Sequence, residues 1–361
     1  MTDTSLASAE TPTASLVRRA SGGGSLWRYV LIRFLLIFPT VFILVTTVFV
    51  LMRATGDPIT AALGGQLTPA QLQERIEAAG YDRPLYIQYV EYLGRIVTGD
   101  FGTTLDNQRV VDVLLRYGGA TLELAIYALA VAFVVGIPLG MIAAAVRDRW
   151  GDALLRVFAI LCYATPVFFA GILLKLVFSV WLGVLPTSGR ASPRVEIALG
   201  RLEGATGIYT IDAIRTGNPA YIADVLSHAV LPGLALGLLT AGVFLRLVRT
   251  NVIGTLSMPY IDAARSRGVG EMRLVGTHAY RPALIPIITV IGLQIAMLLG
   301  GAVLTETTFE WSGLGFQLSE FLKARDFVAV QGIVALLAVI VALSNFVVDI
   351  VAAFIDPRVR Y

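Results

Sequence analysis

Six long stretches without Asp, Glu, Lys or Arg divide this 361-residue chain. Each stretch has 18 to 24 residues, and roughly 20 apolar residues in a helix are enough to cross the hydrocarbon core of a membrane. Only 15% of all residues are charged, against about 25% in an average soluble domain. We therefore predict an all-α, polytopic membrane protein with six transmembrane helices. The uncharged stretches are 34–52, 124–146, 157–174, 225–245, 282–305 and 327–348.

Arginine positions predict how these helices are oriented, because cytoplasmic loops carry an excess of Lys and Arg. The segment 246–282 holds six arginines and two acidic residues, whereas 305–326 holds four acidic and two basic residues. We therefore expect 246–282 and both chain termini on the cytoplasmic side of a multi-pass protein.

The chain divides into a short tail and one transmembrane domain. Residues 1–27 are rich in Ser, Thr, Ala and Gly, which is typical of a disordered tail, and the domain covers 28–361. In the first outer loop, Thr68 and a following proline predict a helix start, Gly80 predicts its end, and 85–96 forms a second amphipathic helix. We expect transmembrane helices at about 31–52, 121–146, 154–182, 227–249, 283–305 and 327–354, a cytoplasmic loop at 250–282, and outer loops at 53–120, 183–226 and 306–326.

Several chemistries have no motif in this sequence. There is no G-x-x-x-x-G-K-[ST] phosphate loop and no H-E-x-x-H. One cysteine and two histidines are too few for a multi-cysteine cluster or a histidine-rich metal site. We therefore expect no catalytic residue, metal or cofactor in this chain, and no nucleic-acid partner, since the net charge is only +3.

The predicted membrane helices contain few polar side chains. We expect Lys175 to reach toward the outer surface and Asn345 with Asp349 to cap the cytoplasmic end of the last helix. Gln294 and Gln331 could line a transport path, although hydrogen bonds between helices are the more common role of such residues. The scarcity of charge argues against a proton-driven secondary carrier, which usually keeps ionisable groups inside its helix bundle. A membrane enzyme also lacks support, since no nucleophile–base pair or metal motif is present.

The segment from Met258 onward, MPYIDAARSRGVGEMR, predicts a short helix, a tight turn and a second helix. Ser257 can cap the first helix and Pro259 can occupy its first position. Ile261 and Ala264 then share one face, and Gly268 permits the left-handed turn that ends the helix. By composition alone, this segment could be an ordinary amphipathic linker at the membrane surface.

The spacing of Asp262, Ala263, Ala264 and Gly268 resembles the EAA loop of ABC importer permeases, with Asp262 in place of the usual Glu. In that family the loop docks a cytoplasmic ATPase. The small residues let the helix enter a groove of the ATPase, and the glycine makes the turn. The resemblance implies an ATPase-coupling loop formed by Tyr260, Asp262, Ala263, Ala264, Arg265, Arg267 and Gly268.

Further motifs extend the resemblance from residue 28 to the end of the chain. In order, they are Gly56-Asp-Pro58, Asp82-Arg-Pro-Leu85, Gly99-Asp-Phe-Gly102, Gly136-Ile-Pro-Leu-Gly140, Leu185-Pro-Thr-Ser-Gly189, Leu299-Gly-Gly-Ala-Val303 with Glu306, Trp311-Ser-Gly-Leu-Gly315 and Asp356-Pro-Arg-Val-Arg-Tyr361. Each motif is weak by itself, but their order and spacing resemble the B-type permease subunit of dipeptide and oligopeptide ABC importers. The resemblance implies the type I ABC importer permease fold.

The resemblance also implies partners and a location. They are a homologous C-type permease, two cytoplasmic ATPases that bind ATP and Mg, and an extracytoplasmic peptide-binding protein, assembled in the cytoplasmic (inner) membrane of a bacterium. The expected function is import of short peptides by alternating access, and nickel-chelate or other small-solute import is the alternative. Glu306 and Trp311 join Gln294 and Gln331 as candidate path or gate residues. Trp311 could equally meet the binding protein or anchor its loop at the membrane interface.

Overall fold

The structure is a computed structural model that describes residues 26–54, 58–65, 67–78 and 80–355. The predicted tail, apart from its last two residues, lies outside this range, as do Gly56, Asp57 and the closing 356–361 motif. The side chains of residues 26, 58, 61–62, 284–286, 288–293, 295–297, 299–301, 352 and 354–355 are also outside the description.

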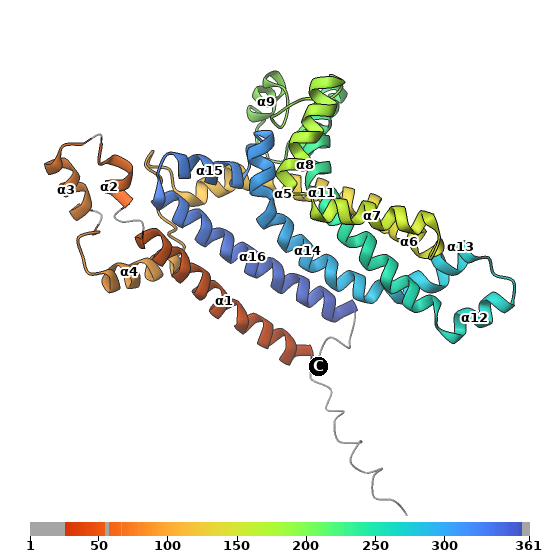
Figure 1. Cartoon of the computed structure of the whole chain (residues 1–361). Coiled ribbons are helices and arrows are strands. Elements are labelled where there is room, and N and C mark those ends of the chain that lie inside the picture. Colours follow the sequence, from red (N-terminus) through yellow and green to blue (C-terminus); the bar gives the residue numbers. More distant parts are fainter. Residues whose placement is uncertain (1–25, 55–57, 66, 79, 356–361) are drawn as a thin grey trace, which may run out of the picture.

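Long apolar helices dominate the described chain, which contains no named strand (Figure 1). Four are long and apolar enough to cross a membrane: α1 (Leu26–Ala54), the continuous helix α5 (Val110–Val131)–η3 (Ala132–Gly136)–α6 (Ile137–Ala145), α11 (Pro219–Leu256) and α16 (Phe327–Ile355). A bent helix pair makes a fifth candidate span. The helix α14 (Tyr280–Phe309) covers the stretch predicted as 283–305. The polytopic, all-α class is thus confirmed, and the number six stays a prediction.

The bent pair replaces the single helix expected at 154–182. Helix α7 (Trp150–Ala164) and the unit α8 (Val167–Leu174)–η4 (Lys175–Trp181) meet at 105°. Thr165 takes an extended conformation with ψ 124°, because the ring of the following Pro166 disfavours the helical conformation there. Pro166 also has no N–H to continue the helical ladder. The chain therefore changes direction in the middle of an apolar stretch.

Helix α11 lies at the centre of the fold, against α5, α6, α7, α8 and α14. Small residues allow the closest of these contacts. A Cβ built on Gly136 would lie 2.7 Å from the Ala241 carbonyl oxygen, and one on Gly140 would lie 2.9 Å from that of Leu245. Glycine is required because no side chain fits between the two backbones. The Gly136-Ile-Pro-Leu-Gly140 motif is therefore a packing motif.

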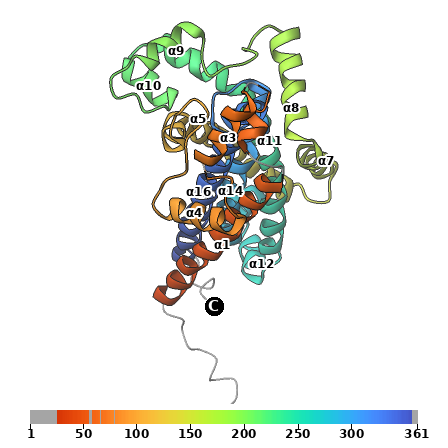
Figure 2. The ribbon, with the colours of Figure 1, turned by 90° about the vertical axis from the view of Figure 1, so that its left-hand side faces the viewer.

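The bundle has two ends (Figures 1 and 2). The α12 end carries α12 (Pro259–Ser266), the start of α1 and the last turns of α16. The α15 end carries α15 (Leu314–Lys323), α9 (Pro193–Gly200), α10 (Tyr209–Thr216) and the short helices after α1. Helix α1 packs along α16, and Arg33 pairs with Asp349 at 3.1 Å near the α12 end. Asp349 therefore joins two helices, whereas the sequence predicted a cap.

The segment after α1 forms α2 (Pro58–Leu63), α3 (Pro69–Ala78) and α4 (Leu85–Val97). Thr68 and Gln71 form the reciprocal cap that starts α3, and Gly80 follows the helix with φ +73°. Both predictions from the sequence are confirmed. Helix α4 is fixed on α1, where the Tyr89 hydroxyl lies 2.6 Å from that of Thr46.

Candidate functional site

The loop with the EAA-like spacing connects α11 to α14 at the α12 end. It consists of residues 257–279: α12, a turn, α13 (Glu271–Arg273) and the π-helical η5 (Leu274–Ala279). The sequence predicted a longer loop, 250–282. Residues 250–256 instead continue α11, and residues 280–282 already belong to α14. The helix–turn–helix form of the loop is as predicted.

One apolar side chain fastens α12 to the bundle. Ile261 is fully buried in a cluster with Val248 and Val252 of α11, Leu274 of η5 and Ala144 of α6. A buried isoleucine of this kind contributes about 2–5 kcal/mol relative to alanine. The orientation of α12 is therefore set by the same cluster that joins α6 and α11.

The turn after α12 has the hydrogen bonds of a Schellman motif. The Val269 N–H donates to the Ala264 carbonyl (3.3 Å) and the Gly268 N–H to the Arg265 carbonyl (2.9 Å). Gly268 has φ +82°, a conformation that costs other L-residues energy because of their Cβ. The role of Gly268 in ending the helix is thus confirmed.

Arg265 closes the loop from the other side of the turn. Its guanidinium donates to Asp262 at 2.8 Å and to Glu271 at 2.7 Å. The hydrogen bond between Arg265 and Glu271 holds the pKa of Glu271 below its ordinary value. Arg265 is therefore engaged within the loop, and it presents a fixed pair of carboxylates at the surface.

The face of α12 opposite Ile261 is open to solvent. Ala263, Asp262 and Arg267 are exposed, and Tyr260 is 47% exposed. Met258 and Met272 add exposed apolar area, 50% and 70% respectively. This mixture of small, apolar and charged groups on a fixed helix is suited to contact with another protein.

Two details of the predicted loop differ in the structure. Ser257 does not cap α12, because its hydroxyl donates back to the Ile253 and Gly254 carbonyls at the end of α11. Ala264 is half-buried against the Ile261 cluster. Of the two alanines, Ala263 is therefore the one accessible to a partner.

The candidate gate residues Glu306 and Trp311 lie together at the α15 end. The Glu306 carboxylate accepts a hydrogen bond from the Thr121 hydroxyl (2.6 Å) and one from the Phe316 N–H (2.9 Å). The Trp311 ring donates to the Ala120 carbonyl (2.9 Å). Both side chains are fully buried, so in this conformation they tie the α14–α15 turn to α5, and Trp311 is not at the outer surface. Their role in a path or gate stays a prediction.

The remaining polar candidates are separated. Gln331 of α16 lines a small pocket near α4. Gln294 of α14 is half-buried and is not among the residues that line this pocket. Lys175 is half-buried, and its ammonium donates to the Thr308 carbonyl at 2.9 Å. A cation at this position satisfies a carbonyl of the last helical turn of α14.

A buried ion pair between Arg190 and Glu123 was not predicted from the sequence. The guanidinium contacts the carboxylate at 2.6 Å and the Gly207 carbonyl at 2.7 Å, and both side chains are at least 96% buried. Glu123 also accepts a hydrogen bond from the Thr210 N–H at 2.7 Å. The pair fastens the 190–210 segment to α5. The two residues are 67 positions apart, so no local spacing could reveal the contact.

Long apolar helices on both sides of a central α11 define a multi-pass membrane protein. The model of the family described as "Binding-protein-dependent transport system inner membrane component" matches residues 136–361, and the model of the N-terminal part of such components matches 26–109. The chain belongs to this family.

Named relatives match almost the whole chain. The dipeptide transport system permease protein of Alkalihalophilus pseudofirmus is 33% identical over 335 residues, which cover 92% of this chain and 99% of that protein. The di/tripeptide transport system permease protein of Pseudomonas aeruginosa is 36% identical over 329 residues, 90% of this chain and 96% of that protein. A chain of the MetNI methionine ABC transporter in inward facing conformations matches with a TM-score of 0.51 and 16% identity, covering 68% of this chain and 97% of that one. The expected ABC importer permease fold is thereby confirmed.

Proposed function

We propose that this chain is the permease subunit of an ATP-driven importer of short peptides in the cytoplasmic membrane of a bacterium. The relatives named for dipeptide and di/tripeptide transport support the substrate class, since each aligns with at least 90% of this chain. A homologous C-type permease would complete the path, and an extracytoplasmic peptide-binding protein would deliver the substrate.

The observation that carries this proposal is the exposed face of α12, held in place from below by Ile261 and from the side by Arg265. A cytoplasmic ATPase would bind this face, with Ala263 at the contact and Tyr260, Asp262 and Arg267 around it. ATP and Mg would be bound by the ATPase subunits. The permease itself would contribute no catalytic residue.

Transport would follow alternating access. Closure of two ATPases would displace α12, and the Ile261 cluster would pass that displacement to α11, α6 and α14. Such packed clusters move as units and do not deform continuously. The ATPases would supply the energy, and this chain would convert their movement into opening of the path.

An alanine-to-tryptophan pair of variants tests the docking face. Ala263→Trp places an indole on the exposed face of α12, and Ala205→Trp makes the same change at an exposed position of the α15 end. Both variants would be expressed together with the proposed partner subunits and purified from the membrane through a tag on this chain. They would then be analysed for co-eluting subunits and for peptide uptake in proteoliposomes.

We expect Ala263→Trp to lose the co-eluting ATPases and ATP-driven uptake, with a partner affinity lowered by about 10- to 100-fold. The C-type permease should still co-elute, which shows that the chain is folded. Ala205→Trp should behave as the unchanged protein. Full uptake by Ala263→Trp would refute docking at this face, and a chain that transports without any ATPase would refute the importer as a whole.

A further inference from the structure

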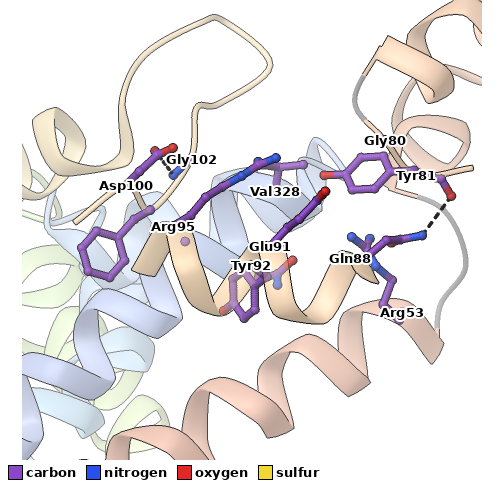
Figure 3. A pocket seen from close by; sticks show the side chains of 13 residues that line it. Arg53, Gly80, Tyr81, Gln88, Glu91, Tyr92, Arg95, Asp100, Gly102 and Val328 are labelled. Atoms are coloured by element: carbon purple, nitrogen blue, oxygen red, sulfur yellow. Dashed lines mark hydrogen bonds between the residues drawn. The ribbon is translucent and has the colours of Figure 1, made fainter. Parts of the chain in front are cut away.

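A polar pocket opens between three helices at the α15 end (Figure 3). It holds about 60 Å³, where 10–15 Å³ already accommodates one water. Arg53 enters it from the end of α1 and approaches Gln88 of α4, while Val328 and Gln331 come from the first turns of α16. None of the contacts described for the coupling loop reaches this pocket.

Hydrogen-bonding groups in this pocket are buried without partners. They are the Nε and Nη1 of Arg53 and the Oε1 of Gln88. The Tyr92 hydroxyl is buried beside them, within reach of the Gln331 side chain. Burial raises the pKa of Tyr92 to about 12, so its hydroxyl is a donor at neutral pH. Buried polar groups are nearly always hydrogen-bonded in folded proteins. The pocket therefore offers two kinds of donor and one acceptor to a ligand.

The charge of the pocket favours an anion. Arg53 lies over the ring of Tyr81, 4.4 Å from its centroid, and Arg95 also lines the pocket. Of the two carboxylates, Glu91 is paired with Arg83, and Asp100 accepts a hydrogen bond from the Gly102 N–H at 3.0 Å. Two arginines and two carboxylates thus line the pocket, but Arg83 outside the lining neutralises Glu91. One positive charge is left in excess, and an arginine fork matches the geometry of a phosphate.

An apolar groove of about 540 Å³ lies on the same three helices. Phe42 and Val45 of α1, Ile96 and Val97 of α4, and Val339 of α16 are among the residues that line it. Val97 is 85% exposed and Phe42 52% exposed, so the groove is open to the surroundings. No charged side chain lines it.

Along the helix axes, the pocket and the groove follow one another as the headgroup and the acyl chain of a lipid do. Val45 lies eight residues before Arg53 on α1, and Val339 lies eight residues after Gln331 on α16. Eight residues correspond to about 12 Å of helix. Both steps run away from the α15 end and toward the middle of the membrane helices. A phosphate at Arg53 would therefore have apolar space below it at the depth of an acyl chain.

We propose that the Arg53 pocket and the α1–α4–α16 groove form a binding site for an anionic glycerophospholipid whose headgroup carries hydroxyls. The phosphodiester would accept hydrogen bonds from Arg53 and Tyr92, a headgroup hydroxyl would donate to Gln88, and one acyl chain would occupy the groove. Helix α4 would thereby be fixed to the membrane in the leaflet at the α15 end, which the arginine distribution predicts to be the outer one.

Photolabelling tests this site on the chain purified with its partner subunits. The probes are phosphatidylglycerol and phosphatidylcholine, each with a diazirine in one acyl chain, in nanodiscs of otherwise identical composition. Labelled peptides would be mapped by mass spectrometry. The exposed apolar faces of α7 and α8 serve as the internal reference for nonspecific lipid contact. We expect phosphatidylglycerol to label 37–45 and 93–97 in excess over this reference, and phosphatidylcholine to label them at the reference level.

Arg53→Gln should lower the phosphatidylglycerol label by about tenfold, because it removes charged hydrogen bonds to the phosphate. Arg194→Gln, which changes an exposed arginine on α9, should leave it unchanged. Val97→Trp, which fills the open edge of the groove, should also lower it. The reference label on α7 and α8 must persist in every variant, which shows that the chain is folded.

Three results would overturn the proposal. The first is equal labelling by both lipids, since it identifies ordinary annular lipid. The second is an unchanged label in Arg53→Gln. The third is a phosphatidylglycerol label that disappears in excess inorganic phosphate and is unchanged in Val97→Trp. This result would identify a site for the free anion.

Discussion

Replacement of Gly268 should destabilise the turn of the coupling loop. The free-energy cost depends only on the backbone conformation at this residue. A Cβ at this position would meet no atom within 4 Å, so steric contact plays no part. The residue has φ +82°, and alanine in the left-handed region costs about 1–2 kcal/mol. Asparagine costs less, because it tolerates this region. Proline costs about 3 kcal/mol or more, since it fixes φ near −65° and removes the N–H that donates to Arg265.

Hydrogen exchange in the purified complex measures this loss directly. A cost of 1–2 kcal/mol raises the population of the locally open turn by about 5- to 30-fold. Exchange of the amides in 264–274 should therefore increase in the order Gly268, Gly268→Asn, Gly268→Ala and Gly268→Pro. If the loop couples ATP hydrolysis to transport, peptide uptake per ATP should fall in the same order.

Gly270→Ala provides the matched control two residues away. Gly270 has φ −66° and open space at its Cβ position, so alanine fits there without strain. Because Gly270 is the N-cap of α13, where alanine is less favourable than glycine, a small increase in exchange is expected, but less than in Gly268→Ala. Equal exchange in Gly268→Ala and Gly270→Ala would refute the argument that the left-handed conformation at Gly268 stabilises the loop.

Two further predictions concern charged groups. Arg190→Met should lower the free energy of unfolding of the purified chain by about 3–5 kcal/mol, because Glu123 is left buried without its cation. Addition of Glu123→Gln should restore part of this loss. An unchanged melting temperature in the single variant would contradict the role of this pair. Since Arg265 holds the pKa of Glu271 below its ordinary value of 4.5, their interaction is complete above pH 4.5 and is lost as the pH falls through the lowered pKa. Hydrogen exchange corrected for intrinsic rates should thus show the loop opening only below pH 4.5, and Glu271→Gln should abolish this step.

The sequence predicted the long helices and the form of the coupling loop because both depend on local rules. Charges mark where an apolar helix leaves the membrane, and Gly268 marks a left-handed helix end. The break after α7 also had a local signal in Pro166. Counting only uncharged residues overlooked it, because proline is apolar and interrupts the helix through its ring and missing N–H.

Contacts between distant segments could not be predicted from spacing. Arg190 meets Glu123, Arg33 meets Asp349, and Lys175 meets the Thr308 carbonyl, all across turns whose geometry one sequence does not specify. The outward face of α12 was only partly predicted. The shared face of Ile261 and Ala264 was predicted, and both alanines were expected to enter the ATPase groove. The packing of Ala264 on the Ile261 cluster depends on where α6 and η5 lie.

Helix α11 is long enough to connect the two ends of the bundle. Its 38 residues extend about 57 Å, nearly twice the roughly 30 Å of the hydrocarbon core. One end lies beside α10, and the other reaches Leu256 in the cluster around Ile261. A tilt of about 5° about one end displaces the other by about 5 Å. A displacement of about 5 Å at the α12 end therefore corresponds to only a small change in the tilt of α11.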